Sequence, residues 1–132
     1  MRAEGEAVVD ASLVVDFVLG GSQAVAIGAH IDGLELWAPA HIDAEILSAM
    51  GRMRRAGELS VREAGARLDE AMDIPLRREL LDHLVAGAWR RRGRLRLADA
   101  LYVEVASRHN VPLLTTDARL GRAVAIAEVI TS

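Results

Sequence analysis

Two aspartates stand at positions where a carboxylate could take part in chemistry. Asp10 directly follows the apolar run at residues 7–9, and Asp117 follows a strand expected at residues 111–115. A continuous apolar run suits a strand buried on both faces, and open α/β sheets bind ligands at the carboxyl ends of their strands. The pattern therefore predicts that both carboxylates lie at that edge of the sheet. Each aspartate could instead only cap the helix that follows it.

Two further acids lie on the apolar faces of expected helices. Glu45 comes three residues after Ile42 on its helix, and Asp99 shares a face with Tyr102 and Val103. Glu45 could be a flank residue whose stem packs while its carboxylate reaches water. Asp99 could simply favour the helix dipole in a first turn. Neither explanation predicts what the spacing permits, which is the convergence of four acids on one site.

A cluster of carboxylates requires a cation or a proton. Two carboxylates about 4 Å apart repel by roughly 4 kcal/mol at an effective dielectric constant of about 20. Ligation by oxygen alone favours Mg²⁺ or Mn²⁺, and the absence of cysteine excludes a thiolate site. A bound metal lowers the pKa of its water and neutralises charge on a phosphate. Ser12 and Thr115 are candidates to orient the carboxylates or waters.

The acids must be positioned by strands that alternate with helices, a pattern typical of an α/β domain with a mainly parallel sheet. The expected strands span residues 6–10, 34–38, 111–115 and 128–130, with a short edge strand at 73–76. The expected helices span residues 12–19, 22–30, 41–56, 60–72, 78–92, 97–108 and 118–124. Ser12 is expected to cap the first helix, and Ser60 with Glu63 is expected to form a capping box.

Length and composition are those of one domain over residues 1–132. Hydrophobic residues make up 52% of the 132 positions, which excludes a disordered chain. Asp10 and Asp16 interrupt the longest apolar stretch, so we expect no membrane span. The acidic residues among positions 1–6 do not resemble a signal peptide. Together with the absence of cysteine, these features favour a cytoplasmic protein.

The basic residues have an unusual distribution. All 16 are arginine, and the net charge is −3. Five of them lie within seven positions: Arg90, Arg91, Arg92, Arg94 and Arg96. Arginine binds phosphate bidentately, so this run is a candidate RNA contact, although it could equally be a solvated helix end. Trp89 beside it could stack on a base or only pack.

The four acids in this order resemble the pattern of PIN domains. The segments that carry the resemblance are Val9–Ser12, Glu45 on its helix, Asp99–Tyr102 and Thr115–Asp117. In length and order the chain is most similar to the VapC toxins of bacterial toxin–antitoxin pairs. The resemblance covers nearly the whole chain and implies a PIN-like three-layer sandwich, with a mainly parallel sheet of four to five strands flanked by helices.

The resemblance also implies a function and partners. The family's acidic quartet falls on Asp10, Glu45, Asp99 and Asp117, and its supporting hydroxyls fall on Ser12 and Thr115. It implies a Mg²⁺- or Mn²⁺-dependent endoribonuclease that leaves a 5′-phosphate and a 3′-hydroxyl. It further implies a homodimer and an antitoxin that blocks the site. Asp16 and Tyr102 lie at positions that vary across the family, so the resemblance assigns them no catalytic role.

Two other functions compete with this interpretation. One is a regulatory RNA- or protein-binding module with a degenerate site, against which the intact quartet argues. The other is phosphotransfer, as in receiver domains or haloacid-dehalogenase-like phosphatases. Both of those classes use a lysine, which this chain lacks, and the phosphatases need a second aspartate where Ser12 stands.

Overall fold

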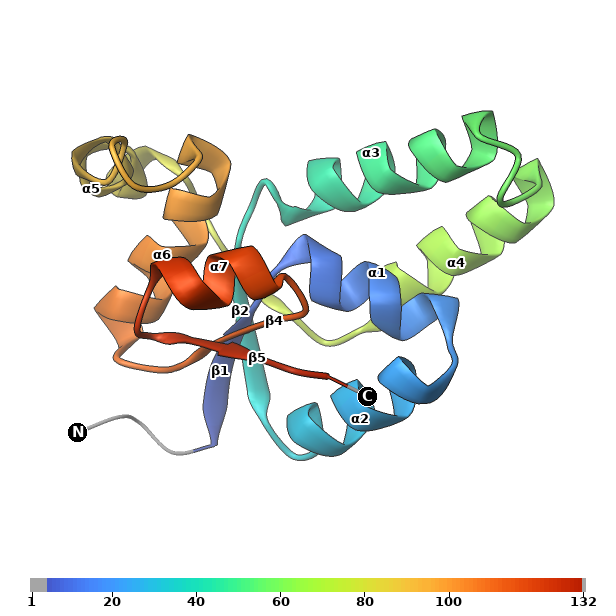
Figure 1. Ribbon diagram of the computed structural model, residues 1–132, viewed down its shortest axis with the longest axis horizontal. Coiled ribbons are helices and arrows are strands. Elements are labelled where there is room, and N and C mark those ends of the chain that lie inside the picture. The colour runs from blue at the N-terminus through green and yellow to red at the C-terminus, as the bar shows by residue number, and fades with distance from the viewer. Residues whose placement is uncertain (1–4, 132) are drawn as a thin grey trace.

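Strand β1 is the centre of a five-stranded parallel sheet in the computed structural model, which describes residues 5–131 (Figure 1). The strand order is β3-β2-β1-β4-β5, and every neighbouring pair is parallel. The bounds are β1 Glu6–Val9, β2 Glu35–Pro39, β3 Arg77–Glu79, β4 Leu113–Thr115 and β5 Ala127–Val129. Residues 7–9 of β1 are fully buried, as the apolar run predicts for a central strand covered on both faces.

Helices cover both faces of this sheet. Their bounds are α1 Ala11–Leu19, α2 Ser22–Ile31, α3 Ile42–Arg55, α4 Val61–Asp73, α5 Val85–Arg90, α6 Leu97–His109 and α7 Ala118–Ala123, with a 3₁₀ turn at Asp82–Leu84. Helices α5 and α6 lie on one side of the sheet and α1 and α2 on the other, while α3 and α4 form a hairpin that extends away from it (Figure 1). The predicted three-layer α/β sandwich is confirmed.

Helix α3 carries one acid of the site, and apolar spacing fixes its orientation. Ile42, Ile46 and Met50 recur at four-residue intervals and are almost fully buried. Helix α4 then packs against α3, and its start is fixed by the predicted capping box between Ser60 and Glu63. The buried stripe therefore determines which way the remaining side chains of α3 point.

Three details differ from the sequence prediction. Asp10, not Ser12, caps α1, because the Asp10 side chain accepts the Leu13 N–H. The third strand is Arg77–Glu79 instead of residues 73–76, since α4 continues to Asp73 and the strand itself is polar. The helix expected over residues 78–92 is consequently shorter and begins after this strand. An exposed edge strand rich in arginine carries no apolar signal in the sequence.

Two expectations concern membranes and export. Among the described residues, no helix is both long and apolar enough to cross a bilayer. Residues 1–4, which belong to the segment judged unlike a signal peptide, lie outside the described range.

Candidate active site

Asp10 is a buried carboxylate held by three hydrogen bonds. Its Oδ1 accepts from the Leu13 N–H at 3.0 Å and from Ser12 Oγ at 2.9 Å, and its Oδ2 accepts from Thr115 Oγ1. The residue is 6% exposed, and no cation of residues 5–131 forms an ion pair with it. The pKa of Asp10 is raised to about 6, because burial, with a smaller contribution from the charge of Asp99, raises it by more than the three hydrogen bonds lower it. The metal-free fold therefore loses stability as pH rises above about 3.8, the ordinary pKa of the group, and this loss is complete above about pH 6; a nearby cation would relieve it.

Thr115 joins the ends of two neighbouring strands. It is the last residue of β4, it is fully buried, and its hydroxyl donates to Asp10 at the end of β1. The same hydroxyl accepts the Asp117 N–H at 3.0 Å. Ser12 Oγ lies 3.4 Å from Thr115 Oγ1, and the Ser12 hydroxyl donates to Asp10 Oδ1. These two hydroxyls thus fix the orientation of Asp10 relative to the main chain that carries Asp117.

Glu45 is anchored by a tyrosine from helix α6. The buried Tyr102 hydroxyl on α6 donates to Glu45 Oε1 at 2.6 Å. Burial raises the pKa of Tyr102, and the hydrogen bond and charge of Glu45 raise it further, so the phenol remains a donor. His41 Nε2 lies 3.5 Å from the same carboxylate oxygen and 3.0 Å from the Ala98 carbonyl oxygen. Tyr102 therefore determines where this carboxylate lies.

Asp99 and Asp117 are joined by an arginine. Asp117 caps α7 by accepting the Arg119 and Leu120 N–H groups at Oδ1, and Asp99 lies buried in the first turn of α6. Arg119 Nη2 donates to Asp99 Oδ2 at 3.2 Å and to Asp117 Oδ2 at 3.1 Å. Arg96 Nε donates to Asp99 Oδ2 at 3.1 Å. Two guanidinium groups therefore compensate the charge of Asp99.

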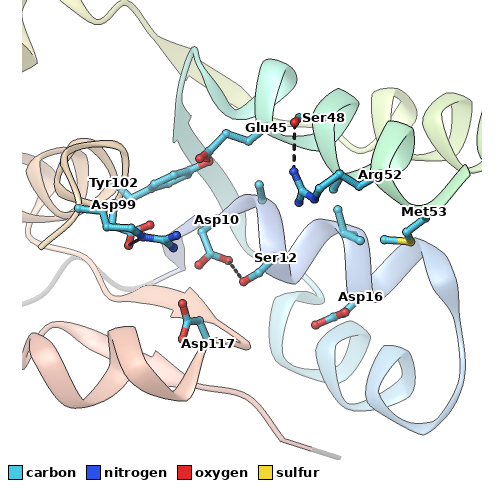
Figure 2. Close-up of a pocket in the computed structure, with 14 residues that line it drawn as sticks. Asp10, Ser12, Asp16, Glu45, Ser48, Arg52, Met53, Asp99, Tyr102 and Asp117 are labelled. Atoms are coloured by element: carbon cyan, nitrogen blue, oxygen red, sulfur yellow. Dashed lines mark hydrogen bonds and ion pairs between the residues drawn. The ribbon is translucent and has the colours of Figure 1, made fainter. Parts of the chain in front are cut away.

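All four acids line one cavity of about 420 Å³. Figure 2 shows Asp10, Glu45, Asp99 and Asp117 around a common space, each carried by a different part of the chain. Asp16, Arg52 and Arg96 also line this cavity. The Asp16 carboxylate accepts from Thr116 Oγ1 at 2.6 Å, and Arg52 contacts Ser48. The site is thus a strongly acidic cavity with arginines among its lining residues.

The donor set of this cavity fits a hard divalent cation. It supplies carboxylate oxygens, which Mg²⁺ and Mn²⁺ prefer, and one of them belongs to a buried aspartate without a cationic partner among residues 5–131. Within the described part of the chain, no three acidic or histidine side chains are already arranged to hold a metal ion. Because Arg119 lies between two of the acids, a bound ion requires a local rearrangement.

The arginine run is divided by the fold. Arg96 contacts Asp99 in the acidic cavity, and Arg91 Nε donates to Glu104 Oε2 on α6 at 2.6 Å. The Arg92 guanidinium lies 4.8 Å from the ring centroid of the exposed Trp89. Arg90 and Arg94 are exposed and line a second, shallow cavity of about 550 Å³. The five arginines therefore do not form one continuous patch.

Sequence reasoning missed three side chains that contact the acids. Tyr102 received no role, and the contacts of Arg96 and Arg119 with Asp99 were not predicted. A signal for Tyr102 was present, because it shares the helical face of Asp99 three residues away. The pairing of Arg119 with Asp99 joins two elements, and no local pattern indicates it.

The fold and cavity define a class of α/β protein in which a parallel sheet presents carboxylates at the carboxyl ends of its strands. The model of the PIN domain family matches residues 7–126, and the chain belongs to that family. It is 49% identical over 126 residues to Ribonuclease VapC3 of Mycobacterium tuberculosis, covering 95% of this chain and 92% of that protein. The predicted resemblance to PIN domains and VapC toxins is thereby confirmed.

Two solved structures share the fold. The crystal structure of PAE2754 from Pyrobaculum aerophilum has a TM-score of 0.69 and 21% identity, covering 94% of this chain and 85% of that one. The structure of Mycobacterium tuberculosis VapC20, described as a sarcin-ricin loop cleaving toxin, has a TM-score of 0.65 and 16% identity. It covers 89% of this chain and 94% of that one. At these identities the likeness supports the architecture alone.

Proposed function

We propose that this protein is a metal-dependent endoribonuclease and the toxin of a toxin–antitoxin pair. The observation that carries the proposal is the convergence of four acids from separate elements on one cavity. The 49% identity to Ribonuclease VapC3 supports RNA as the substrate. Asp10, Glu45, Asp99 and Asp117 are the proposed ligands of Mg²⁺ or Mn²⁺, directly or through water.

Each acid has a distinct part in the proposed site. Asp10 supplies the buried charge nearest the strand ends, and Ser12 and Thr115 hold its carboxylate in one orientation. Tyr102 holds Glu45 on the facing wall. A bound divalent ion would supply an activated water and would neutralise charge on the phosphodiester. The carboxylates of Asp99 and Asp117 would supply further negative charge that holds the ion in the site.

The experiment that tests this function is a cleavage assay with and without metal. The purified chain, free of any antitoxin, is incubated with total RNA in Mg²⁺, in Mn²⁺ and in EDTA. We expect endonucleolytic products with 5′-phosphates in either metal and intact RNA in EDTA. Binding of RNA without cleavage in any metal would favour the degenerate RNA-binding module instead.

The proposed partners follow from a toxic activity. A cell that makes such a nuclease needs a second protein that blocks it, so we propose a cognate antitoxin that places a basic side chain near the four acids. We also propose a homodimer in the cytoplasm. These partners rest on the relationship to the VapC proteins and not on a contact in this chain.

The exposed arginines at and just after the end of α5 provide a separate prediction about RNA affinity. Arg91 already pairs with Glu104, so Arg90 and Arg94 are the members of the run left exposed without a side-chain partner among residues 5–131. If both bind phosphates, the Arg90→Ala/Arg94→Ala variant should bind single-stranded RNA more weakly. The slope of log affinity against log salt concentration is negative, and it should become shallower by about 0.7 for each phosphate contact that is lost.

The matched control removes two arginines from the α3–α4 hairpin. Arg54→Ala/Arg62→Ala changes the net charge equally but leaves the surface beside α5 intact. Fluorescence anisotropy between low and physiological salt, with an Asp10→Asn background to prevent cleavage, measures both slopes. Equal slopes in the two double variants would assign Arg90 and Arg94 to a solvated helix end.

A further inference from the structure

Arg119 forms a bridge between two proposed metal ligands. One nitrogen atom, Nη2, lies within hydrogen-bond distance of Asp99 Oδ2 and of Asp117 Oδ2. These acids belong to different parts of the fold, the first turn of α6 and the residue that caps α7. Arg96 also contacts Asp99, but no contact joins Arg96 to a second acid among residues 5–131. The bridging arrangement therefore distinguishes Arg119 from the other arginine at the site.

The main chain holds Arg119 in position to make this bridge. Its backbone N–H donates to Asp117 Oδ1 at 2.9 Å, so the residue that Arg119 contacts also fixes the start of α7. Leu120 beside it is almost fully buried and anchors the helix. The Arg119 side chain itself is 50% exposed. It can therefore turn toward solvent without any movement of the helix.

A guanidinium and a metal ion cannot share this position. Mg²⁺ holds oxygen ligands at about 2.0–2.1 Å, about 1 Å shorter than the two contacts that Arg119 makes. An ion between the same oxygens would draw the carboxylates inward and leave no room for Nη2. The guanidinium and the metal ion neutralise the same pair of carboxylate charges. Binding of either cation therefore weakens the attraction of these carboxylates for the other.

We propose that Arg119 is an internal competitor of the metal, which occupies the position between Asp99 and Asp117 and must leave it when a divalent ion binds there. The inference rests on the proposed function, because it assigns the metal to these acids. It adds that the chain itself already compensates the charges of Asp99 and Asp117 in the resting site. Metal affinity is then set partly by the strength of an arginine bridge.

The first test is the affinity for Mn²⁺, measured by electron paramagnetic resonance of the free ion without RNA. Arg119→Ala should bind Mn²⁺ about tenfold more tightly than wild type, because a charge-assisted contact no longer has to be broken. Arg122→Ala is the matched control, since Arg122 is exposed one turn further along α7. It should bind Mn²⁺ as wild type does. Equal or weaker affinity in Arg119→Ala would overturn the proposal.

The second test follows Arg119 directly in the wild-type protein. In ¹⁵N-labelled protein, the Nε–H signal of Arg119 is followed during a Mg²⁺ titration, with the charge-conserving Arg119→Lys variant used to assign it. The signal should move with the same midpoint as metal binding, while the signal of Arg122 stays fixed. A saturated site with an unmoved Arg119 signal would overturn the inference.

The two proposals fail in different ways. If neither wild type nor Arg119→Ala binds Mn²⁺, the metal site itself is wrong and the proposed function falls with it. If wild type binds Mn²⁺ and cleaves RNA but Arg119 does not move, the nuclease stands and only the competition is refuted.

Discussion

Replacing Asp10 by asparagine is expected to reduce metal-dependent RNA cleavage by at least about a thousandfold. A unit charge about 4 Å from a cation contributes roughly 4 kcal/mol at an effective dielectric constant of about 20, and this corresponds to about three powers of ten in rate. Growth inhibition on expression without antitoxin should disappear as well. The measurements are the initial cleavage rate in saturating Mg²⁺ and a plating assay.

The substitution is chosen so that the fold survives. Asparagine caps a helix about as well as aspartate, and its amide oxygen can still accept from the Leu13 N–H and the Ser12 hydroxyl. Burial penalises the charged form of Asp10, so a neutral side chain should leave the metal-free protein at least as stable. Loss of activity can then be assigned to the lost charge.

Asp16→Asn is the matched control for this experiment. Asp16 lines the same cavity, but its carboxylate accepts from the Thr116 hydroxyl, and an amide oxygen preserves that hydrogen bond. It should retain most of the wild-type cleavage rate. Full activity in folded Asp10→Asn would remove Asp10 from the site, and an equal loss in Asp16→Asn would extend the site beyond four acids.

The second large effect is expected in the thermal stability of Asp99→Asn. A metal that binds only the folded state stabilises it by about 2.7 kcal/mol at roughly 100 times its dissociation constant. Wild type should gain this amount in Mn²⁺, while Asp99→Asn should gain little at the same concentration because a charged ligand is missing. The measurement is the melting temperature of both proteins in EDTA and in Mn²⁺.

The arginines set the sign of the effect in EDTA. Repulsion among the acids alone predicts that Asp99→Asn melts higher than wild type. Arg96 and Arg119 both donate to Asp99, however, and an amide accepts these bonds more weakly. We therefore expect a slightly lower melting temperature in EDTA. An unchanged response to Mn²⁺ would exclude Asp99 from the metal site, and Asp69→Asn on the exposed face of α4 controls for charge.

The parts of the site predicted from sequence are those that depend on local pattern. Asp10 follows the apolar run of β1, and Glu45 lies on the edge of the buried stripe of α3, so both positions follow from periodicity. The fold class follows from the alternation of strands and helices. Each of these features can be predicted from residues that lie close together in the sequence.

The parts that were missed depend on contacts between distant elements. The hydrogen bond from Tyr102 to Glu45 joins residues 57 positions apart, and Arg119 reaches Asp99 across 20 positions. Strand β3 was misplaced because its pairing with β2 stabilises a polar segment that has no strand pattern of its own. Tertiary pairing overrides propensity at such edges.

The short outer strands have a consequence for how two copies of this chain can associate. Strands β3 and β5 form the two edges of the sheet and are three residues long; all three side chains of β3 are charged, and β5 carries one charged side chain, Glu128. Edges of this kind offer few unpaired backbone groups in register, which disfavours growth of the sheet by addition of a strand from another molecule. Two copies should therefore join through helical surfaces, each keeping its own sheet of five strands, and a crowded cell should not drive these sheets into a continuous ribbon.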